Sequence, residues 1–155
     1  MNLSNAKVRK KQKVHSDLQT NDVYLRNIKI HTDMKQEKAI FAAGCFWGVQ
    51  HQFQRVNGVL NTVVGYTGGP EENPKYPEVK AHQTHHVEAI VVDYDADIVS
   101  YEDLCKVFFE IHDPAQTDGV GPDIGPQYRS EIFYLNEEQK EIAEKIIALL
   151  RSTEH

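Results

Sequence analysis

The stretch that decides the fold is KAIFAAGCFWG, residues 38–48. Its first six residues form an apolar run of strand length that stops at Gly44. A helix is predicted over residues 45–56, because Gly58 then breaks the pattern. The stretch therefore predicts a β-strand that turns directly into a helix, with Cys45 at the junction.

Three further strands and two further helices follow from the same kind of pattern. The strands are expected at residues 59–66, 87–94 and 132–135, which are rich in β-branched and aromatic residues. The helices are expected at residues 101–111, capped by Ser100 with Asp103, and after Asn136, which with Gln139 resembles a capping box. The apolar face of the last helix is predicted to contain Ile142, Ile146, Leu149 and Leu150.

The element order is β-α-β-β-α-β-α, and its first six elements have the split βαβ arrangement. The predicted fold class is therefore α+β, a ferredoxin-like sandwich with a mostly antiparallel sheet and helices on one face. Residues 67–86 and 112–129 show neither the helical nor the strand periodicity of apolar residues, and they are predicted to be long loops. Loops of this length inside a small domain are usually functional.

A chain of 155 residues is long enough for one core. Residues 1–38 carry nine Lys or Arg against four Asp or Glu, whereas the rest is acidic. We therefore expect residues 1–36 to be a basic, flexible or loosely docked extension, and residues 37–155 to be the folded domain. A basic arm that contacts nucleic acid or an acidic partner is the alternative for this extension.

The composition excludes several classes of protein. Hydrophobic residues make up 40%, charged residues 26%, and the net charge is −6, which is typical of a globular protein and argues against a general nucleic-acid binder. Neither a membrane span nor a secretory signal is found, so we expect a cytoplasmic protein, most simply a monomer. Two cysteines are too few for a disulfide scaffold.

Cys45 is the first candidate for chemistry. A helix N-terminus favours an anion, so the pKa of a thiol at this junction should fall and the nucleophilic thiolate should become more populated. Gly44 allows a sharp turn there. Packing is the alternative explanation for a lone cysteine, and it is the one we prefer for Cys105, at the edge of the apolar stripe of the helix at 101–111.

Glu88 is the second candidate. Strand alternation places it on the same face as Ile90, Val92 and Tyr94. A carboxyl group among apolar neighbours is desolvated, which raises its pKa and suits a general acid. A strand-end residue that faces water is the alternative, and the pattern does not decide which face of the strand packs against the helices.

Six segments together resemble the A-type peptide methionine sulfoxide reductases. They are GCFWG (44–48), GYTGG (65–69), Tyr76, HVE (86–88), HDP (112–114) and DIGPQYRS (123–130). Each segment alone is a weak signal, but their order and spacing over residues 38–135 make the resemblance specific. The family reverses the oxidation of methionine.

The resemblance implies a role for each matching residue. Cys45 would be the nucleophile, and Glu88 would donate a proton to the sulfoxide oxygen. Other residues would hold the substrate or organise the site: Phe46 and Trp47 around its methyl group, Tyr76 and Tyr128 on its oxygen, Asp123 as organiser, and Gly44 and His86 beside it. The substrate would be the S epimer of methionine sulfoxide, free or in an oxidised protein.

The reaction implies no metal and no organic cofactor. It would leave Cys45 as a sulfenic acid that an external thiol reduces, such as thioredoxin, glutaredoxin with glutathione, or dithiothreitol. No cysteine follows Cys105, so the resemblance is to a variant without a C-terminal resolving cysteine. Two other departures from the family are a shorter C-terminal region and His85, which stands where the family usually has glycine.

Three other functions compete with this interpretation. His82, His85 and His86 with Cys45 would form a zinc site, although their spacing matches no established set of ligands. Cys45, His86 and Asp123 would form a cysteine hydrolase or acyltransferase, which needs a histidine in hydrogen-bond reach of the sulfur. A module that binds methionine sulfoxide or senses redox state without turnover is the non-enzymatic alternative.

Overall fold

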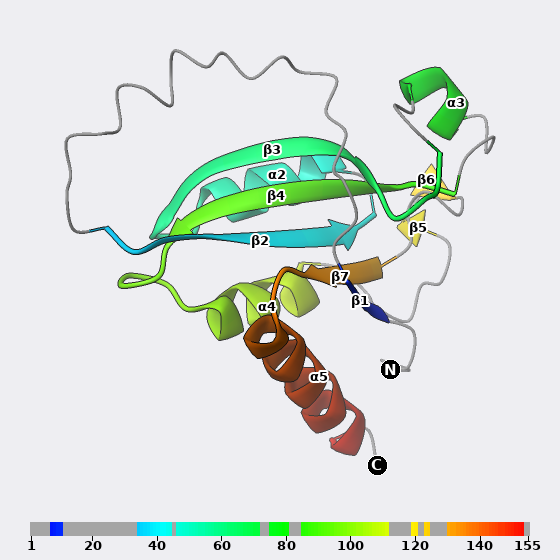
Figure 1. Ribbon diagram of the computed structural model, residues 1–155. Helices are drawn as coiled ribbons and strands as arrows, with labels where there is room; N and C mark the ends of the chain where they lie inside the picture. Colours follow the sequence, from blue (N-terminus) through cyan, green and yellow to red (C-terminus); the bar gives the residue numbers. More distant parts are fainter. Residues whose placement is uncertain are drawn as a thin grey trace.

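The structure is a computed structural model that describes residues 7–10, 34–44, 46–71, 75–80, 85–111, 119–120, 123–124 and 130–153 (Figure 1). Its strands are β1 (Lys7–Lys10), β2 (Gln36–Ala43), β3 (Val59–Thr67), β4 (Val87–Asp95), β5 (Gly119–Val120), β6 (Asp123–Ile124) and β7 (Ser130–Tyr134). Its helices are α2 (Phe46–Gln54), α3 (Tyr76–Lys80), α4 (Tyr101–Glu110) and α5 (Glu137–Ser152).

The main sheet has the strand order β1-β7-β2-β4-β3. Strand β2 pairs antiparallel with both β4 and β7, and β3 pairs antiparallel with β4. The four strands predicted from the sequence thus lie in the order fourth, first, third, second, which is the ferredoxin-like order. The predicted α+β fold class, with a mostly antiparallel sheet, is confirmed.

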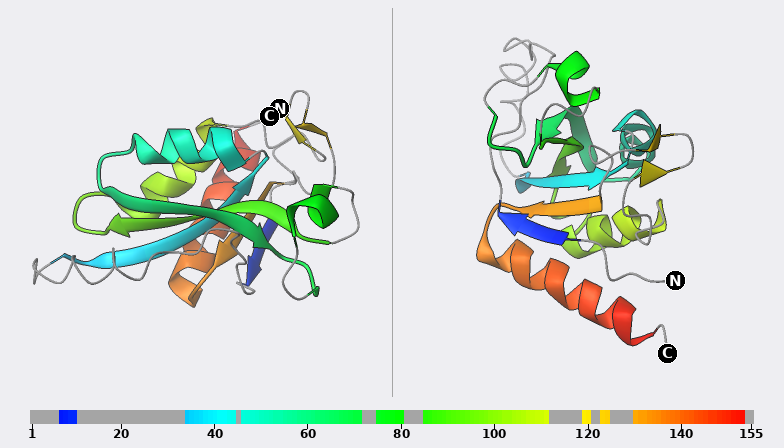
Figure 2. Two further views of the ribbon diagram at one scale, coloured as in Figure 1. Left: turned by 90° about the horizontal axis from the view of Figure 1, so that it is seen from above. Right: turned by 90° about the vertical axis from the view of Figure 1, so that its right-hand side faces the viewer.

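Helices α2, α4 and α5 lie on one side of this sheet (Figures 1 and 2). The sheet residues that face them include Phe41, Ile90 and Ile132, all buried in one apolar cluster. The ring of Phe41 stacks on Phe53 of α2 at 5.1 Å and on Phe108 of α4 at 5.4 Å between centroids. The aromatic side chain of a single β2 residue therefore joins two of the helices to the sheet.

Strand β1 is an element that the sequence pattern did not predict. It lies at the sheet edge, parallel to β7, with Lys7 opposite Glu131. Arg9 forms an ion pair with Glu131 at 3.0 Å and donates a hydrogen bond to the Gly68 carbonyl at 3.1 Å. Part of the basic extension is therefore docked on the sheet, while residues 1–6 and 11–33 lie outside the described residues. The boundary between residues 36 and 37 stays a prediction.

Helix α4 begins as predicted. The Ser100 side chain accepts a hydrogen bond from the Asp103 N–H at 3.0 Å, and the Asp103 carboxylate accepts one from the Ser100 N–H at 3.3 Å. These two bonds form a complete capping box, which satisfies two backbone donors at once.

Helix α5 departs from the sequence prediction in two respects. Gln139 does not close a capping box: its side chain accepts from the Leu135 N–H at 2.9 Å and donates to the Lys38 carbonyl at 2.7 Å, which ties α5 to β2. The prediction that Leu149 lies on the buried face is wrong, because its exposure is 63%. Ile147 is buried instead.

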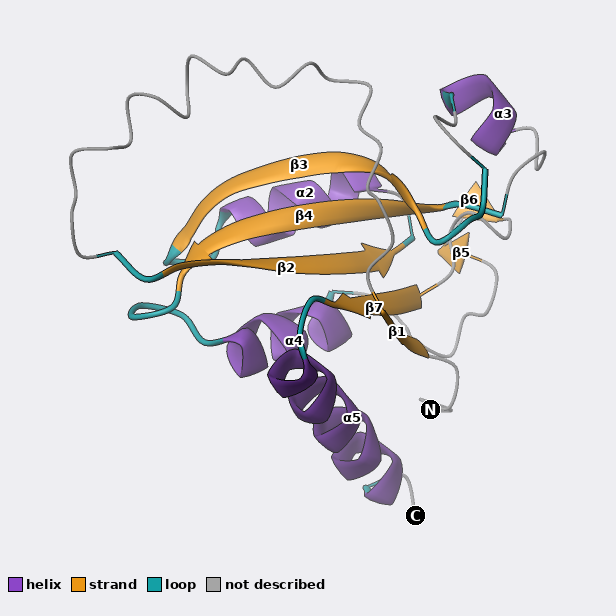
Figure 3. Cartoon of the chain, viewed as in Figure 1, coloured by secondary structure: helices purple, strands orange, loops and turns teal. Residues whose placement is uncertain are grey.

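Both predicted long loops contain short elements (Figure 3). Helix α3 lies in the first, where Pro77 suits the opening turn of a helix and the Glu78 carboxylate accepts from the Lys75 N–H at 2.9 Å. The hairpin β5–β6 lies in the second. No helix within the described ranges has the length and apolar character to cross a membrane.

Candidate active site

Several segments that carry predicted site residues meet at one end of the sheet. Strand β2 ends at Ala43 and β4 begins at Val87 at this end, and α3 and the β5–β6 hairpin lie beside it (Figure 1). The topology produces this arrangement, since antiparallel neighbours place the end of one strand beside the start of the next.

The junction between β2 and α2 has the geometry expected for a reactive cysteine. Gly44 is buried and has a φ of +87°, a conformation that residues with a Cβ rarely adopt. Helix α2 begins at Phe46 with no acidic side chain in its first turn, so the partial positive charge of its N-terminus is not neutralised locally. Cys45 stands between these two residues in the chain, and its own conformation lies outside the described residues.

An exposed tryptophan lies at this helix start. Trp47 is 64% exposed, and a side chain added at Gly48 would meet no atom within 4 Å. Both positions are therefore open to solvent in the first turn of α2, beside the junction. The Phe46 backbone belongs to the same turn, but its side chain lies outside the described residues.

Glu88 faces the helices and is buried. It is 3% exposed, and its cross-strand partner Tyr66 is 2% exposed. Because Ile90 of the same strand face belongs to the helix-covered core, the carboxyl group shares that face, which the sequence pattern left open. The alternative of a strand-end residue facing water is wrong.

His86 is fixed by two hydrogen bonds. Its Nδ1 accepts from the Gly69 N–H at 3.3 Å, so Nε2 carries the proton and donates to the Glu71 carbonyl at 2.8 Å. A Cβ on Gly69 would lie 2.8 Å from the His86 backbone nitrogen, so only glycine fits there. These bonds connect the end of β3 to the residue two positions before Glu88.

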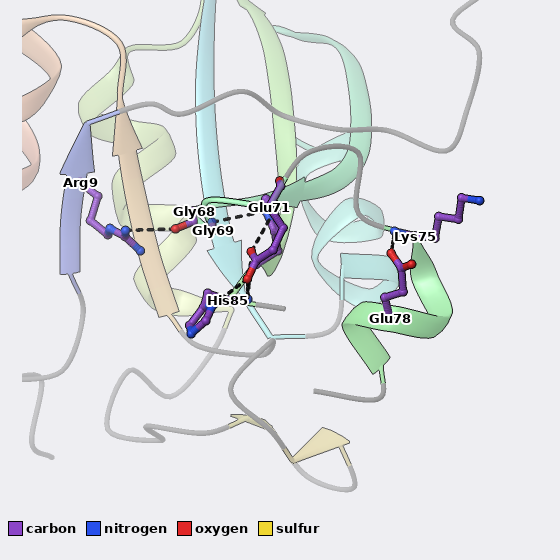
Figure 4. Close-up of polar contacts among 8 residues, drawn as sticks. Arg9, Gly68, Gly69, Glu71, Lys75, Glu78 and His85 are labelled. Carbon is purple, nitrogen blue, oxygen red and sulfur yellow. Dashed lines mark hydrogen bonds and ion pairs between the residues drawn. The ribbon is translucent and has the colours of Figure 1, made fainter. Parts of the chain in front are cut away.

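Glu71 lies next to the predicted site residue His86, and sequence reasoning did not single it out. Its carboxylate accepts from the His85 N–H, at 3.2 Å to each oxygen, and contacts His85 Nδ1 at 2.6 Å (Figure 4). The hydrogen bond with the His85 side chain lowers the pKa of Glu71 to about 2. Glu71 and His85 thus join the two ends of the segment that contains α3. Glu71 follows Gly68-Gly69-Pro70, a sequence that gives no sign of its role. The only signal was His85, which stands where the family usually has glycine and could therefore have suggested a partner nearby.

The remaining predicted site residues are described in part. Tyr76 is the first residue of α3 and Asp123 the first residue of β6, where it pairs with Val120. The side chains of both lie outside the described residues, as do all of Tyr128 and Arg129.

Cys105 is a packing residue, as expected. Its exposure is 0%, and it belongs to the core cluster between α4 and the sheet. Burial raises the pKa of its thiol to about 12, so the thiolate is scarce at neutral pH.

The contacts of His86 weaken two competing functions. Both of its ring nitrogens are already engaged, by the Gly69 N–H and the Glu71 carbonyl. The ring therefore offers no free nitrogen to a metal ion or to a neighbouring thiol. Of the other three zinc ligands considered, His85 contacts the Glu71 carboxylate through Nδ1 at 2.6 Å, and Cys45 and His82 lie outside the described residues.

Comparison with known proteins gives a consistent result. The family model described as peptide methionine sulfoxide reductase matches residues 37–155. The chain is 51% identical over 114 residues to peptide methionine sulfoxide reductase MsrA 1 of Nostoc sp., covering 74% of this chain and 70% of that protein. It is 54% identical over 107 residues to the MsrA of Methanosarcina acetivorans, covering 69% of this chain and 57% of that protein.

Solved structures agree with this result. Methionine sulfoxide reductase A of Corynebacterium diphtheriae superposes with a TM-score of 0.68 at 32% identity, covering 79% of this chain and 61% of that one. Reduced Mxr1 from Saccharomyces cerevisiae gives a TM-score of 0.65 at 32% identity, covering 72% of this chain and 68% of that one.

Fold and site together define a ferredoxin-like α+β protein with a cysteine at a strand-to-helix junction and a buried carboxyl group at the same end of the sheet. The chain belongs to the peptide methionine sulfoxide reductase family. Proteins of the A type reduce methionine sulfoxide and so repair oxidised methionine.

Proposed function

We propose that this chain reduces the S epimer of methionine sulfoxide, free or within proteins, with Cys45 as the nucleophile. The observation that carries the proposal is the position of Cys45 between Gly44, with its positive φ, and the first residue of α2. A thiol at a helix N-terminus has a lowered pKa and yields a thiolate. Glu88 supplies a buried acid at the same end of the sheet.

The reaction transfers one oxygen atom and two electrons. The Cys45 thiolate attacks the sulfoxide sulfur while the sulfoxide oxygen takes up a proton, and the S–O bond of the substrate breaks. The oxygen passes to the cysteine sulfur, so methionine leaves reduced and Cys45 becomes a sulfenic acid. A proton donor beside that oxygen stabilises the charge that develops on it.

The other site residues have the following proposed roles. Glu88 is buried and donates the proton to the oxygen. A buried carboxyl group holds its proton more readily than a carboxyl group in water, which suits this role. Tyr76 and Tyr128 donate hydrogen bonds to the same oxygen, and Asp123 organises them. The substrate contacts are Phe46 and Trp47 around the methyl group, with Gly44 and His86 beside the substrate.

Recovery of the thiol needs two electrons from outside this site. Cys105 does not serve as the resolving thiol in this proposal, because its sulfur is buried in the core and its thiolate is scarce. External thiols therefore reduce the sulfenic acid: a first thiol displaces water and forms a mixed disulfide with Cys45, and a second thiol attacks this disulfide, which frees the Cys45 thiol and leaves the reductant as a disulfide. The candidates are thioredoxin, glutaredoxin with glutathione, and dithiothreitol. We propose that the protein acts as a monomer in the cytoplasm, where thiols are kept reduced.

The test is turnover of separated epimers. The chain is incubated with the S or the R epimer of a blocked methionine sulfoxide and dithiothreitol, and the methionine formed is measured by chromatography. We expect product from the S epimer alone, none with Cys45→Ser, and a rate about 10²- to 10⁴-fold lower with Glu88→Gln. Folded protein that binds the sulfoxide without releasing methionine would support the binding module instead.

A further inference from the structure

A concave site lies on the sheet face away from the helices. Its volume is about 420 Å³, and the described residues that line it are Lys7, Arg9, Gly68, Pro70, His85 and Glu131. Glu131 pairs with Ala42, which belongs to the apolar cluster opposite the helix-covered core. The cavity is therefore distinct from the face that Glu88 occupies.

The described lining carries more positive than negative charge. Lys7 and Arg9 are two residues apart on β1 and so point to the same face of the strand. Glu131, with a side chain 2% exposed, is balanced by Arg9 at 3.0 Å. The Lys7 ammonium therefore contributes a second cation, whereas the described lining contains no second acid.

The cavity lies near the end of the sheet where β2 ends and β4 begins. Its wall at Gly68 and Pro70 is the loop whose Gly69 holds His86, two residues before Glu88. One strand, β7, separates β1 from β2, so the two lie about 10 Å apart at about 4.8 Å for each strand step. An extended peptide spans that distance in about three residues, at roughly 3.3 Å each, and needs about five where it passes around the end of the sheet to the other face.

We propose that this cavity binds the carboxylate of an acidic side chain in a polypeptide substrate, a few residues along the chain from the methionine sulfoxide. The inference rests on the proposed function, and it adds a sequence preference to it. A carboxylate of the substrate fits because the exposed Lys7 ammonium carries a positive charge, and Glu131 is already paired with Arg9.

The test uses matched peptides blocked at both ends, each with one methionine S-sulfoxide. In one series, glutamate stands about three to five residues before or after the sulfoxide, and in the other, glutamine replaces it. We measure kcat and KM at low ionic strength with dithiothreitol. We expect KM to be about two- to five-fold lower for a glutamate peptide than for its glutamine partner, a preference that fades as salt is added.

Variants of β1 identify the cation. Lys7→Gln should bring the ratio of the two KM values close to one, and Lys7→Arg should keep it. Lys10→Gln is the matched control, because Lys10 is exposed on the same strand but on its other face. Because each variant is judged by a ratio, a general loss of activity cancels.

Three outcomes separate the possibilities. Equal KM values for the two peptide series, with normal turnover, would overturn the carboxylate site and leave the proposed function intact. An equal loss of preference in Lys7→Gln and Lys10→Gln would also overturn it, because the effect would then come from net charge alone. No turnover of any peptide would contradict the proposed function itself.

Discussion

Cys105 has a thiol that burial in the core makes unreactive. Its burial and a pKa of about 12 predict that it stays unmodified in the native protein at about pH 8.5. In a Cys45→Ser background Cys105 is the only thiol, so alkylation by iodoacetamide followed by mass spectrometry reports on it alone. We expect labelling only after denaturant is added.

Two results would contradict this assignment. One is fast alkylation of Cys105 in the native protein. The other is a Cys45–Cys105 disulfide in peroxide-treated protein, since it would make Cys105 the resolving thiol after all.

Glu71 predicts a pH dependence of stability. The pKa of its carboxyl group is lowered from 4.5 to about 2 in the folded protein, mainly by the hydrogen bond with His85. The stabilisation is therefore complete above about pH 4.5 and is lost as the pH falls towards 2. We expect Glu71→Gln to unfold at lower urea than the wild type at about pH 7, with a difference that shrinks below about pH 4. A difference that is constant with pH would show that Glu71 acts through packing alone.

At the scale of elements, α2 contains a glycine that its surroundings do not require. A Cβ at Gly48 would meet no atom within 4 Å, and glycine in a helix costs about 0.5–1 kcal/mol relative to alanine. We therefore expect Gly48→Ala to raise the free energy of unfolding by about that amount, measured by urea denaturation.

Gly58, just after the same helix, is the matched control. Its φ is +97°, and a Cβ there would lie 2.7 Å from Val99. Gly58→Ala should therefore lower the free energy of unfolding. A loss of stability in both variants would contradict this prediction, because lack of room for a Cβ could not explain the loss at Gly48.

The four strands predicted from the sequence are present because each contains a run of apolar or β-branched residues that the core buries. Strand β1 was missed because KVRK has a single apolar residue, Val8, and the strand is held by pairing with β7 and by the bonds of Arg9. Helix α3 was missed because five residues are too few for a helical period to appear.

For the site, alternation along β4 correctly grouped Glu88 with Ile90, but only the packing of the helices showed that this face is buried. The contacts of Glu71 with His85 join residues 14 positions apart across a loop. No local period reports such a pair, which explains why it could not be predicted.

At the scale of the whole molecule, an ion pair between Arg9 and Glu131 adds to the backbone pairing that holds the outer strand β1. Arg9→Met removes an ion-pair and hydrogen-bond partner from Glu131, which is 1% exposed, and losing a hydrogen bond to a charged group costs about 1.5–3 kcal/mol. We expect faster hydrogen exchange in β1 and β7, with little change in β2 and β4 at the centre of the sheet.

The double variant Arg9→Met with Glu131→Gln provides the control. Replacing the buried charge should recover part of the lost stability, because a neutral amide costs less to leave without its ion partner. Equal exchange rates in β1 of the wild type and of Arg9→Met would show that backbone pairing alone holds the strand.

The parallel pairing of β1 with β7 also sets an order of events during synthesis on the ribosome. Arg9 and Glu131 are 122 residues apart, so β1 cannot find its neighbour β7 until a further 122 residues have been translated. Strands β2, β3 and β4 and helix α2 have their partners nearby in the chain and can assemble earlier. Strand β1 can therefore dock only after β7 has been translated, when the earlier strands of the sheet have already had time to pair.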